Sequence, residues 1–184
     1  MAHSASSHYL VFSLLTLLKG LRVSAARNIL IAVLLASGAA PAAAGEWGLD
    51  VFGLSYHFDR SKAEVLGTDN GFNPGLGVRY RFATLEHWAF DAEVGAYRDS
   101  GRNTAVQGGV SALWNPWHGL QIGGALVVFK SNTYNDGDAF VAPLPLVGYD
   151  FGPVMVNLTY LPKIQRYNDI ATLGLWVTLW PERW

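Results

Sequence analysis

The feature that most constrains this chain is a two-residue alternation along residues 45–184, in which charged side chains occupy only one of the two faces. In residues 76–82, the even positions are all apolar, whereas Arg79 and Arg81 share the other face with a glycine. A period of two indicates β-strands, because successive side chains of a strand point to opposite faces. The pattern therefore predicts a sheet with one wholly apolar face and one charged face.

The next run of alternation supplies the opposite charges. A hairpin centred on Glu86 places Arg81 opposite Asp91 and Arg79 opposite Glu93. Oppositely charged pairs directly across two antiparallel strands stabilise a sheet. On a lipid-facing surface, each of these charges would cost about 2–4 kcal/mol near the bilayer midplane. We therefore expect the charged face to line the interior of a barrel. A soluble barrel of lipocalin type is the alternative, but its exterior is polar and its interior apolar.

Eight such runs follow one another, at residues 47–58, 75–83, 88–98, 104–114, 120–129, 140–150, 153–161 and 170–180. Each has about the length that a tilted strand needs to cross a bilayer. Short turns alternate with longer polar loops, as in outer-membrane barrels with an even number of strands. The predicted fold is all-β, an eight-stranded antiparallel transmembrane β-barrel. A girdle of aromatic residues is expected at the end with the short turns: Trp88, Trp114, Trp117, Trp180 and Trp184.

Residues 1–44 have the pattern of an export leader. Arg22 and Arg27 precede an apolar run at residues 29–36, and small residues precede an expected cut before Gly45. We therefore divide the chain into a cleaved signal peptide, residues 1–44, and a barrel domain, residues 45–184. An N-terminal membrane anchor is the alternative, although the apolar run is short for a span. The expected location is the outer membrane of a Gram-negative cell.

Composition excludes several classes of function. The chain has 13 Lys and Arg and 14 Asp and Glu, and the leader holds three of the bases and none of the acids. The barrel domain is therefore acidic, which argues against a nucleic-acid partner, because nucleic-acid binding requires a basic surface. With no cysteine, the chain has no thiolate metal site. His87 and His118 fall in different turns, so we expect neither a metal nor a cofactor.

His57, Asp99 and Ser100 are the candidate catalytic residues. The alternation places Phe52 outward and His57 inward on the first strand, and Asp99 inward at the end of the third. These two strands run in the same direction, so their ends meet at one mouth of the barrel. Histidine accepts a proton near neutral pH, and a carboxylate can support its charge. The three residue types suit acyl transfer; the alternative is that they are solvated loop anchors.

Several segments resemble the lipid A palmitoyltransferase family, and they follow in the family's order over nearly the whole barrel domain: residues 55–57 (SYH), 70–77 (NGFNPGLG), 97–100 (YRDS), 142–149 (APLPLVGY), 152–154 (GPV) and 159–162 (TYLP). The resemblance implies transfer of a palmitoyl chain from a phospholipid to a hydroxyacyl chain of lipid A. It implies that His57 activates the acceptor hydroxyl, that Asp99 supports its charge, and that Ser100 binds the ester or acts as nucleophile. The implied partners are a phospholipid donor and a lipid A acceptor, with the barrel acting as a monomer.

The resemblance also implies an acyl pocket and a lateral gate. Gly109 corresponds to the residue at the pocket floor that sets chain length; the alternative is that glycine here only eases the curvature of a small barrel. Pro143 or Pro145, together with Pro153, corresponds to the gate, because proline donates no hydrogen bond to a strand ladder. The alternative is that these prolines mark strand ends or turns. Other small residues are expected to leave room in the lumen: Gly53, Gly95, Gly123 and Ala125.

Two other functions stay open. A non-enzymatic structural or adhesion barrel predicts a solidly packed lumen and tolerance of substitution at His57. A lipid A deacylase also uses serine and histidine at a barrel surface, but no His-x-Ser arrangement lies near these residues. The sequence ranks acyl transfer first, the non-enzymatic barrel second and the deacylase third.

Overall fold

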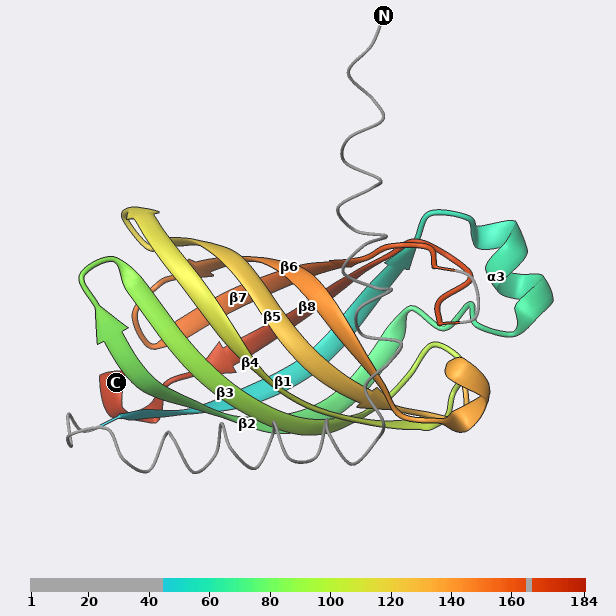
Figure 1. Ribbon diagram of the computed structural model, residues 1–184, viewed down its shortest axis with the longest axis horizontal. Coiled ribbons are helices and arrows are strands. Elements are labelled where there is room, and N and C mark those ends of the chain that lie inside the picture. Colours follow the sequence, from blue (N-terminus) through green and yellow to red (C-terminus); the bar gives the residue numbers. More distant parts are fainter. Residues whose placement is uncertain (1–44, 165–166) are drawn as a thin grey trace, which may run out of the picture. The chain divides into compact units, whose positions relative to one another are not determined.

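The computed structural model describes residues 45–164 and 167–184, which form a closed barrel (Figure 1). The predicted leader, residues 1–44, lies outside the described residues. Neighbouring strands are antiparallel, and the order around the barrel is β1(Glu46–His57), β2(Phe72–Leu85), β3(Trp88–Arg98), β4(Thr104–Trp117), β5(Leu120–Lys130), β6(Phe140–Asp150), β7(Val154–Leu161) and β8(Thr172–Leu179). The predicted eight-stranded antiparallel barrel is confirmed.

Short helices occupy two of the loops and the end of the chain. Helix α3(Arg60–Leu66) lies between β1 and β2, η1(Asn135–Gly137) between β5 and β6, and η2(Pro181–Arg183) after β8. Asp59 caps α3 by accepting a hydrogen bond from the Lys62 amide, at 3.0 Å. In the part of the chain that the structure describes, no helix is both long and apolar enough to cross a membrane.

The predicted register of the first hairpin is confirmed. Arg79 pairs with Glu93 and Arg81 with Asp91 across β2 and β3, and their side chains form ion pairs of 2.7 and 2.8 Å. Arg79 is fully buried and also contacts Asp50 and Asp91, each at 3.4 Å. The five donors of a guanidinium allow one arginine to bind several carboxylates. We call these five residues the charge network; it fills the lumen on the side of the short turns.

The exterior carries exposed apolar side chains on every strand. Three examples are Leu54, which is 54% exposed, Leu76, which is 59% exposed, and Val94, which is 63% exposed. Each alternates along its strand with neighbours that face the lumen. An apolar exterior over a charged interior reverses the pattern of a soluble barrel, and it suits a barrel surrounded by lipid. Transmembrane barrels of this kind belong to outer membranes. The surface therefore agrees with the predicted outer-membrane location.

Two side chains point differently from the prediction. Pairing skips one residue between Phe52 and Leu54, so Gly53 forms a bulge in β1. A bulge inserts an extra residue and reverses the alternation before it. Phe52 therefore faces the lumen, with its ring centroid 5.1 Å from that of Tyr97, and the predicted outward direction of Phe52 is wrong. The same reversal brings Asp50 into the charge network.

Trp180 is the second correction. It was expected in the aromatic girdle, but it is fully buried. Its ring lies between two guanidinium groups, with Arg81 at 4.8 Å and Arg183 at 4.6 Å from the ring centroid. Arg183 in turn binds Asp150 at 2.8 Å and also pairs with Glu46. Cations over aromatic faces stabilise such stacks, so Trp180 closes the turn end of the lumen.

The lumen is apolar on the side of the long loops. Large side chains there pack on a common core, some at the loop ends of their strands and some farther inside: Tyr97, Phe129, Phe140 and Leu161 at the ends, and Phe52, Leu144 and Trp176 inside. We call this set the apolar cluster. It separates the charge network from the loop end of the barrel, where the candidate catalytic residues lie.

Candidate functional site

His57 and Ser100 meet at the loop end of the barrel. His57 is the last residue of β1, and Ser100 lies in the loop between β3 and β4. His57 Nε2 and Ser100 Oγ are 3.0 Å apart, and both residues are buried. The predicted inward direction of His57 holds because His57 follows the bulge at Gly53. This pair has the spacing that a histidine needs to exchange a proton with a hydroxyl.

Ser55 and Asn70 hold this pair from the side of the β1–β2 loop. Ser55 Oγ lies 3.4 Å from Ser100 Oγ and donates to the Asn70 carbonyl oxygen at 3.3 Å. The Asn70 backbone amide donates to the Ser100 carbonyl oxygen at 3.3 Å, and the Asn70 side-chain amide donates to the Asp99 backbone carbonyl oxygen at 3.2 Å. Two loops far apart in sequence are therefore bound together at Ser100.

Asp99 is buried beside Ser100, but its carboxylate has other partners. One oxygen accepts a hydrogen bond from the Asn103 amide at 2.9 Å, and the other accepts one from the Ser131 hydroxyl. Among the described contacts, neither oxygen bonds His57 or Ser100. The structure therefore brings all three predicted residues to one place, and it gives Asp99 the contacts of a loop anchor.

An exposed ion pair adds a second link between the same loops. Arg102 donates to both carboxylate oxygens of Asp69, at 3.0 and 3.2 Å. These hydrogen bonds and the guanidinium charge lower the pKa of Asp69 below its ordinary value. Asp69 therefore stays ionised at neutral pH, and the link between the β1–β2 and β3–β4 loops persists there.

A small cavity opens beside His57. It has a volume of about 160 Å³, and residues of three outer loops line it together with His57: Leu66, Thr68, Thr133, Tyr134, Tyr167, Asn168, Asp169 and Ile170. Burial and the neighbouring Asp99 carboxylate raise the pKa of Tyr134 to about 12, against a smaller lowering effect of the nearby Ser100 hydroxyl. The Tyr134 hydroxyl is therefore protonated at neutral pH.

Sequence reasoning missed Ser131 and Tyr134. Both lie in a polar loop without periodicity, between the end of β5 and the start of β6. The conformation of that loop brings Ser131 to Asp99, and no local signal in the sequence marks these two residues as part of the site.

The seam between β6 and β7 is incomplete on the loop side. Its pairing runs from Asp150 with Met155 to Leu146 with Thr159, and the remaining residues of β6 have no partner on β7. Pro143 and Pro145 lie in this unpaired stretch, and their role in a lateral gate stays a prediction. The Pro145 carbonyl oxygen nevertheless accepts a hydrogen bond from Thr159 Oγ1 at 2.9 Å.

Pro153 does not border the unpaired stretch. It precedes β7 at the turn end of the seam, where its carbonyl oxygen accepts a hydrogen bond from the Trp180 amide at 2.8 Å. Assigning Pro153 to the gate is therefore wrong on geometric grounds. Pro162 directly follows β7, at the loop end of the seam, where the residues of β6 have no partner on β7.

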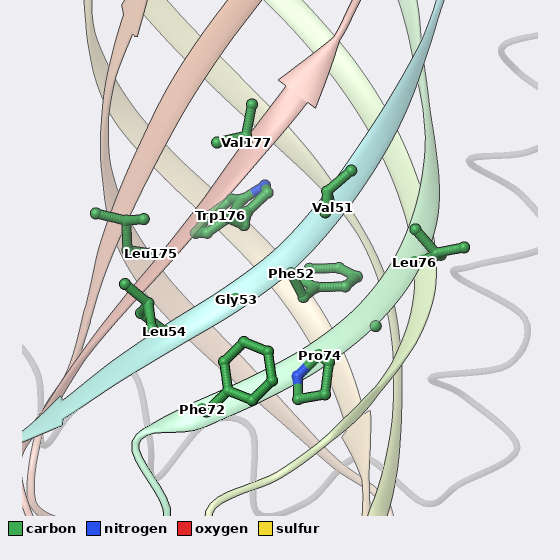
Figure 2. A pocket seen from close by; sticks show the side chains of 11 residues that line it. Val51, Phe52, Gly53, Leu54, Phe72, Pro74, Leu76, Leu175, Trp176 and Val177 are labelled. Atoms are coloured by element: carbon green, nitrogen blue, oxygen red, sulfur yellow. The ribbon is translucent and has the colours of Figure 1, made fainter.

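A larger apolar pocket opens on the exterior at the bulge of β1. Its volume is about 560 Å³, and β1, β2 and β8 line it. Figure 2 shows Phe52, Phe72 and Pro74 around the place where β1 and β2 diverge. Pairing there skips from Phe52 with Gly75 to Leu54 with Phe72. No feature of the sequence indicated this pocket, because the bulge itself was not predicted.

Gly109 lies inward on β4, paired with Glu93 of the charge network and with Val127 of β5. A Cβ atom at this position would collide with the Leu126 carbonyl oxygen and lie 2.9 Å from Val127 Cα. Close approach of two backbones is thus one reason for glycine here. Its place next to the charge network fits a pocket floor, and the gauging of chain length stays a prediction.

The glycine at position 95 does not leave free space in this structure. A Cβ atom on Gly95 would lie 2.6 Å from the Phe52 ring, which covers Gly77 as well. Phe52 therefore occupies volume that the sequence assigned to an acyl chain. Within residues 45–164 and 167–184, no group of three His, Cys, Asp or Glu side chains is arranged to hold a metal ion.

Comparison with known proteins shows no matching family model and no matching curated protein. Two solved structures are similar. The outer membrane protein Ail of Yersinia pestis, in a phospholipid bilayer nanodisc, is 9% identical with a TM-score of 0.40, covering 73% of this chain and 98% of Ail. Neisserial surface protein A is 13% identical with a TM-score of 0.34, covering 73% of this chain and 95% of that protein. At these values, neither likeness carries an inference about activity or partners.

Proposed function

We propose that this barrel is an outer-membrane acyltransferase that moves a palmitoyl or similar long acyl chain from a phospholipid to a hydroxyl group of lipid A. The observation that carries the proposal is the contact of 3.0 Å between His57 Nε2 and Ser100 Oγ at the mouth of an apolar lumen. A base and a hydroxyl beside a space for a chain are the parts that acyl transfer needs.

The proposed reaction needs no metal or cofactor. His57 takes the proton of the lipid A hydroxyl, whose oxygen attacks the carbonyl carbon of the phospholipid ester. The carbonyl oxygen becomes an oxyanion, which hydrogen-bond donors such as the Ser100 hydroxyl stabilise. The intermediate then breaks its bond to the glycerol oxygen. That oxygen takes the proton from His57, so a lysophospholipid leaves and the histidine is neutral again.

The apolar cluster supports an acyl substrate. Burying a chain in such surroundings stabilises it by about 0.8 kcal/mol for each CH₂ group. The unpaired stretch of β6, with Pro143 and Pro145, lies at the same end and suits sideways passage of a lipid. Because the Phe52 ring covers Gly77 and Gly95, binding a chain requires Phe52 to change rotamer.

A non-enzymatic barrel is the second candidate. It is favoured by the filled space over Gly95 and by the loop-anchoring contacts of Asp99. In that case, the contact between His57 and Ser100 only ties β1 to the β3–β4 loop, and lipid A is not modified.

The mass spectrum of lipid A separates the two candidates. The chain is expressed in a Gram-negative host that lacks its own palmitoyltransferase, beside His57→Ala and Ser100→Ala. His87→Ala and Ser111→Ala are the matched controls: His87 is exposed in a turn, and Ser111 is buried in the lumen away from the loops. Acyl transfer predicts a gain of one long acyl chain that His57→Ala abolishes and both controls keep. An unchanged spectrum with folded barrel in the outer membrane would reject the acyltransferase.

A further inference from the structure

We propose that Tyr134, in the β5–β6 loop, is a further catalytic residue, whose hydroxyl donates a hydrogen bond to the acyl ester that reacts beside His57 and Ser100. The inference rests on the proposed acyl transfer and adds a residue to it. It assigns a chemical role to a loop in which the sequence marks no functional position.

Tyr134 and His57 line the same cavity, of about 160 Å³. Ser100 stands 3.0 Å from His57 Nε2 at the edge of this site, and it is close enough to Tyr134 to affect the pKa of the phenol. The cavity therefore lies between a base from β1 and a phenol from the β5–β6 loop. A substrate ester that enters this cavity meets both groups at once.

A network of hydrogen bonds fixes this loop against the rest of the site. Ser131 donates to the Asp99 carboxylate and accepts from the Thr133 amide at 3.1 Å, while the Tyr134 amide donates to the Ser131 carbonyl oxygen at 3.4 Å. The Asn103 side chain donates to Thr133 Oγ1 at 3.0 Å. Asp99 does not bond His57, and these contacts indicate another role for it. Asp99 positions the loop that carries Tyr134.

The close contact between the β3–β4 and β5–β6 loops also supports a fixed position for Tyr134. A Cβ atom on Gly101 would collide with the Thr133 side chain, so the β3–β4 and β5–β6 loops touch at a residue that has no side chain. The loop that carries Tyr134 is held against the β3–β4 loop at Asp99, Gly101 and Asn103, and a fixed donor loses little energy to reorganisation during a reaction.

The chemistry requires a protonated phenol. With a pKa near 12, raised by burial and by Asp99, Tyr134 is a donor at neutral pH and does not compete with His57 as a base. When the acceptor oxygen attacks the ester, the carbonyl oxygen gains a negative charge, and the hydrogen bond from Tyr134 strengthens at that moment. His57 carries the proton from the acceptor hydroxyl to the leaving glycerol oxygen, so Tyr134 neither gains nor loses a proton.

The test compares Tyr134→Phe with wild type, using folded full-length barrel in detergent micelles with dipalmitoyl phosphatidylcholine as donor and lipid A as acceptor. Removing one hydrogen-bond donor to an oxyanion costs on the order of a hundredfold in kcat, so we expect a loss of that size with KM little changed. Tyr149→Phe is the matched control, because Tyr149 lies on the outward face of β6 near the turn end of the barrel, away from the cavity. It should keep the wild-type kcat.

The outcomes separate the inference from the proposed function. If wild type transfers no acyl chain, both fail. If wild type is active and Tyr134→Phe keeps its kcat, or Tyr149→Phe loses as much, only the role of Tyr134 is overturned. Should Tyr134→Phe not fold, Ser131→Ala is the second variant. It removes the hydrogen bond between the β5–β6 loop and Asp99 without replacing any side chain that lines the cavity. An unchanged kcat in that variant overturns the inference as well.

Discussion

Replacing Arg79 by methionine should destabilise the barrel more than any other single removal of charge. Arg79 is fully buried and faces the carboxylates of Asp50, Asp91 and Glu93 at 2.7–3.4 Å. The charge network holds two guanidinium groups against three carboxylates, so Arg79→Met leaves Arg81 alone against three buried acids. Methionine keeps much of the volume of the side chain, which isolates the effect of charge from that of a cavity.

Breaking a buried ion pair by removing one partner typically costs about 3–5 kcal/mol, because the remaining charge is left without compensation. Asp50 and Glu93 both lose their cation here, while Asp91 keeps Arg81, so we expect a loss at the upper end of that range. A second change, Glu93→Gln in the Arg79→Met background, removes one of the stranded charges. It should restore about 0.5–3 kcal/mol, the usual size of coupling between contacting residues.

Urea unfolding of barrel refolded into phospholipid vesicles, followed by tryptophan fluorescence, measures these free energies of unfolding. The matched control is Arg102→Met, since Arg102 forms an equally close pair with Asp69 but both side chains are well exposed. An exposed pair is screened by water, so this variant should unfold like wild type. If Arg79→Met loses under about 1 kcal/mol, or no more than Arg102→Met, the charge network does not stabilise the lumen as argued.

Two further substitutions test the surface and the predicted pocket floor. Val78→Arg puts a charge on the outward face midway along β2, and it should lower the free energy of unfolding in vesicles by about 2–4 kcal/mol. Thr104→Arg, at a strand end, should lower it by about 1 kcal/mol or less. Equal losses in the same urea assay would argue against a bilayer around the barrel. Gly109→Ala forces its methyl group onto the Leu126 carbonyl oxygen and should cost about 1–3 kcal/mol. Gly108→Ala is its control, because a Cβ atom there meets only ordinary contacts, and equal stability of the two variants would refute a close approach at Gly109.

The candidate site was predictable only where it followed the strands. His57 and Ser100 were expected at one mouth because β1 and β3 run in the same direction, and the structure places them 3.0 Å apart. The partners of Asp99 were not predictable, since Ser131 lies on a loop whose conformation the alternation does not specify. The sequence shows where the prolines are, but it does not show which end of the β6–β7 seam each one borders. For this reason, the assignment of Pro153 to the gate failed.

By itself, the sequence determined the strands, the antiparallel barrel, the register of Arg79 with Glu93, and the direction of most side chains. These features are local, because alternation and turn position fix which face a residue occupies and which residue it opposes. Only the tertiary structure decided the bulge at Gly53, which turns Phe52 and Asp50 inward, and the burial of Trp180 between two arginines. A bulge where both faces are apolar leaves no mark in the alternation. Contacts among loops and across the lumen exist only once the ring of strands has closed.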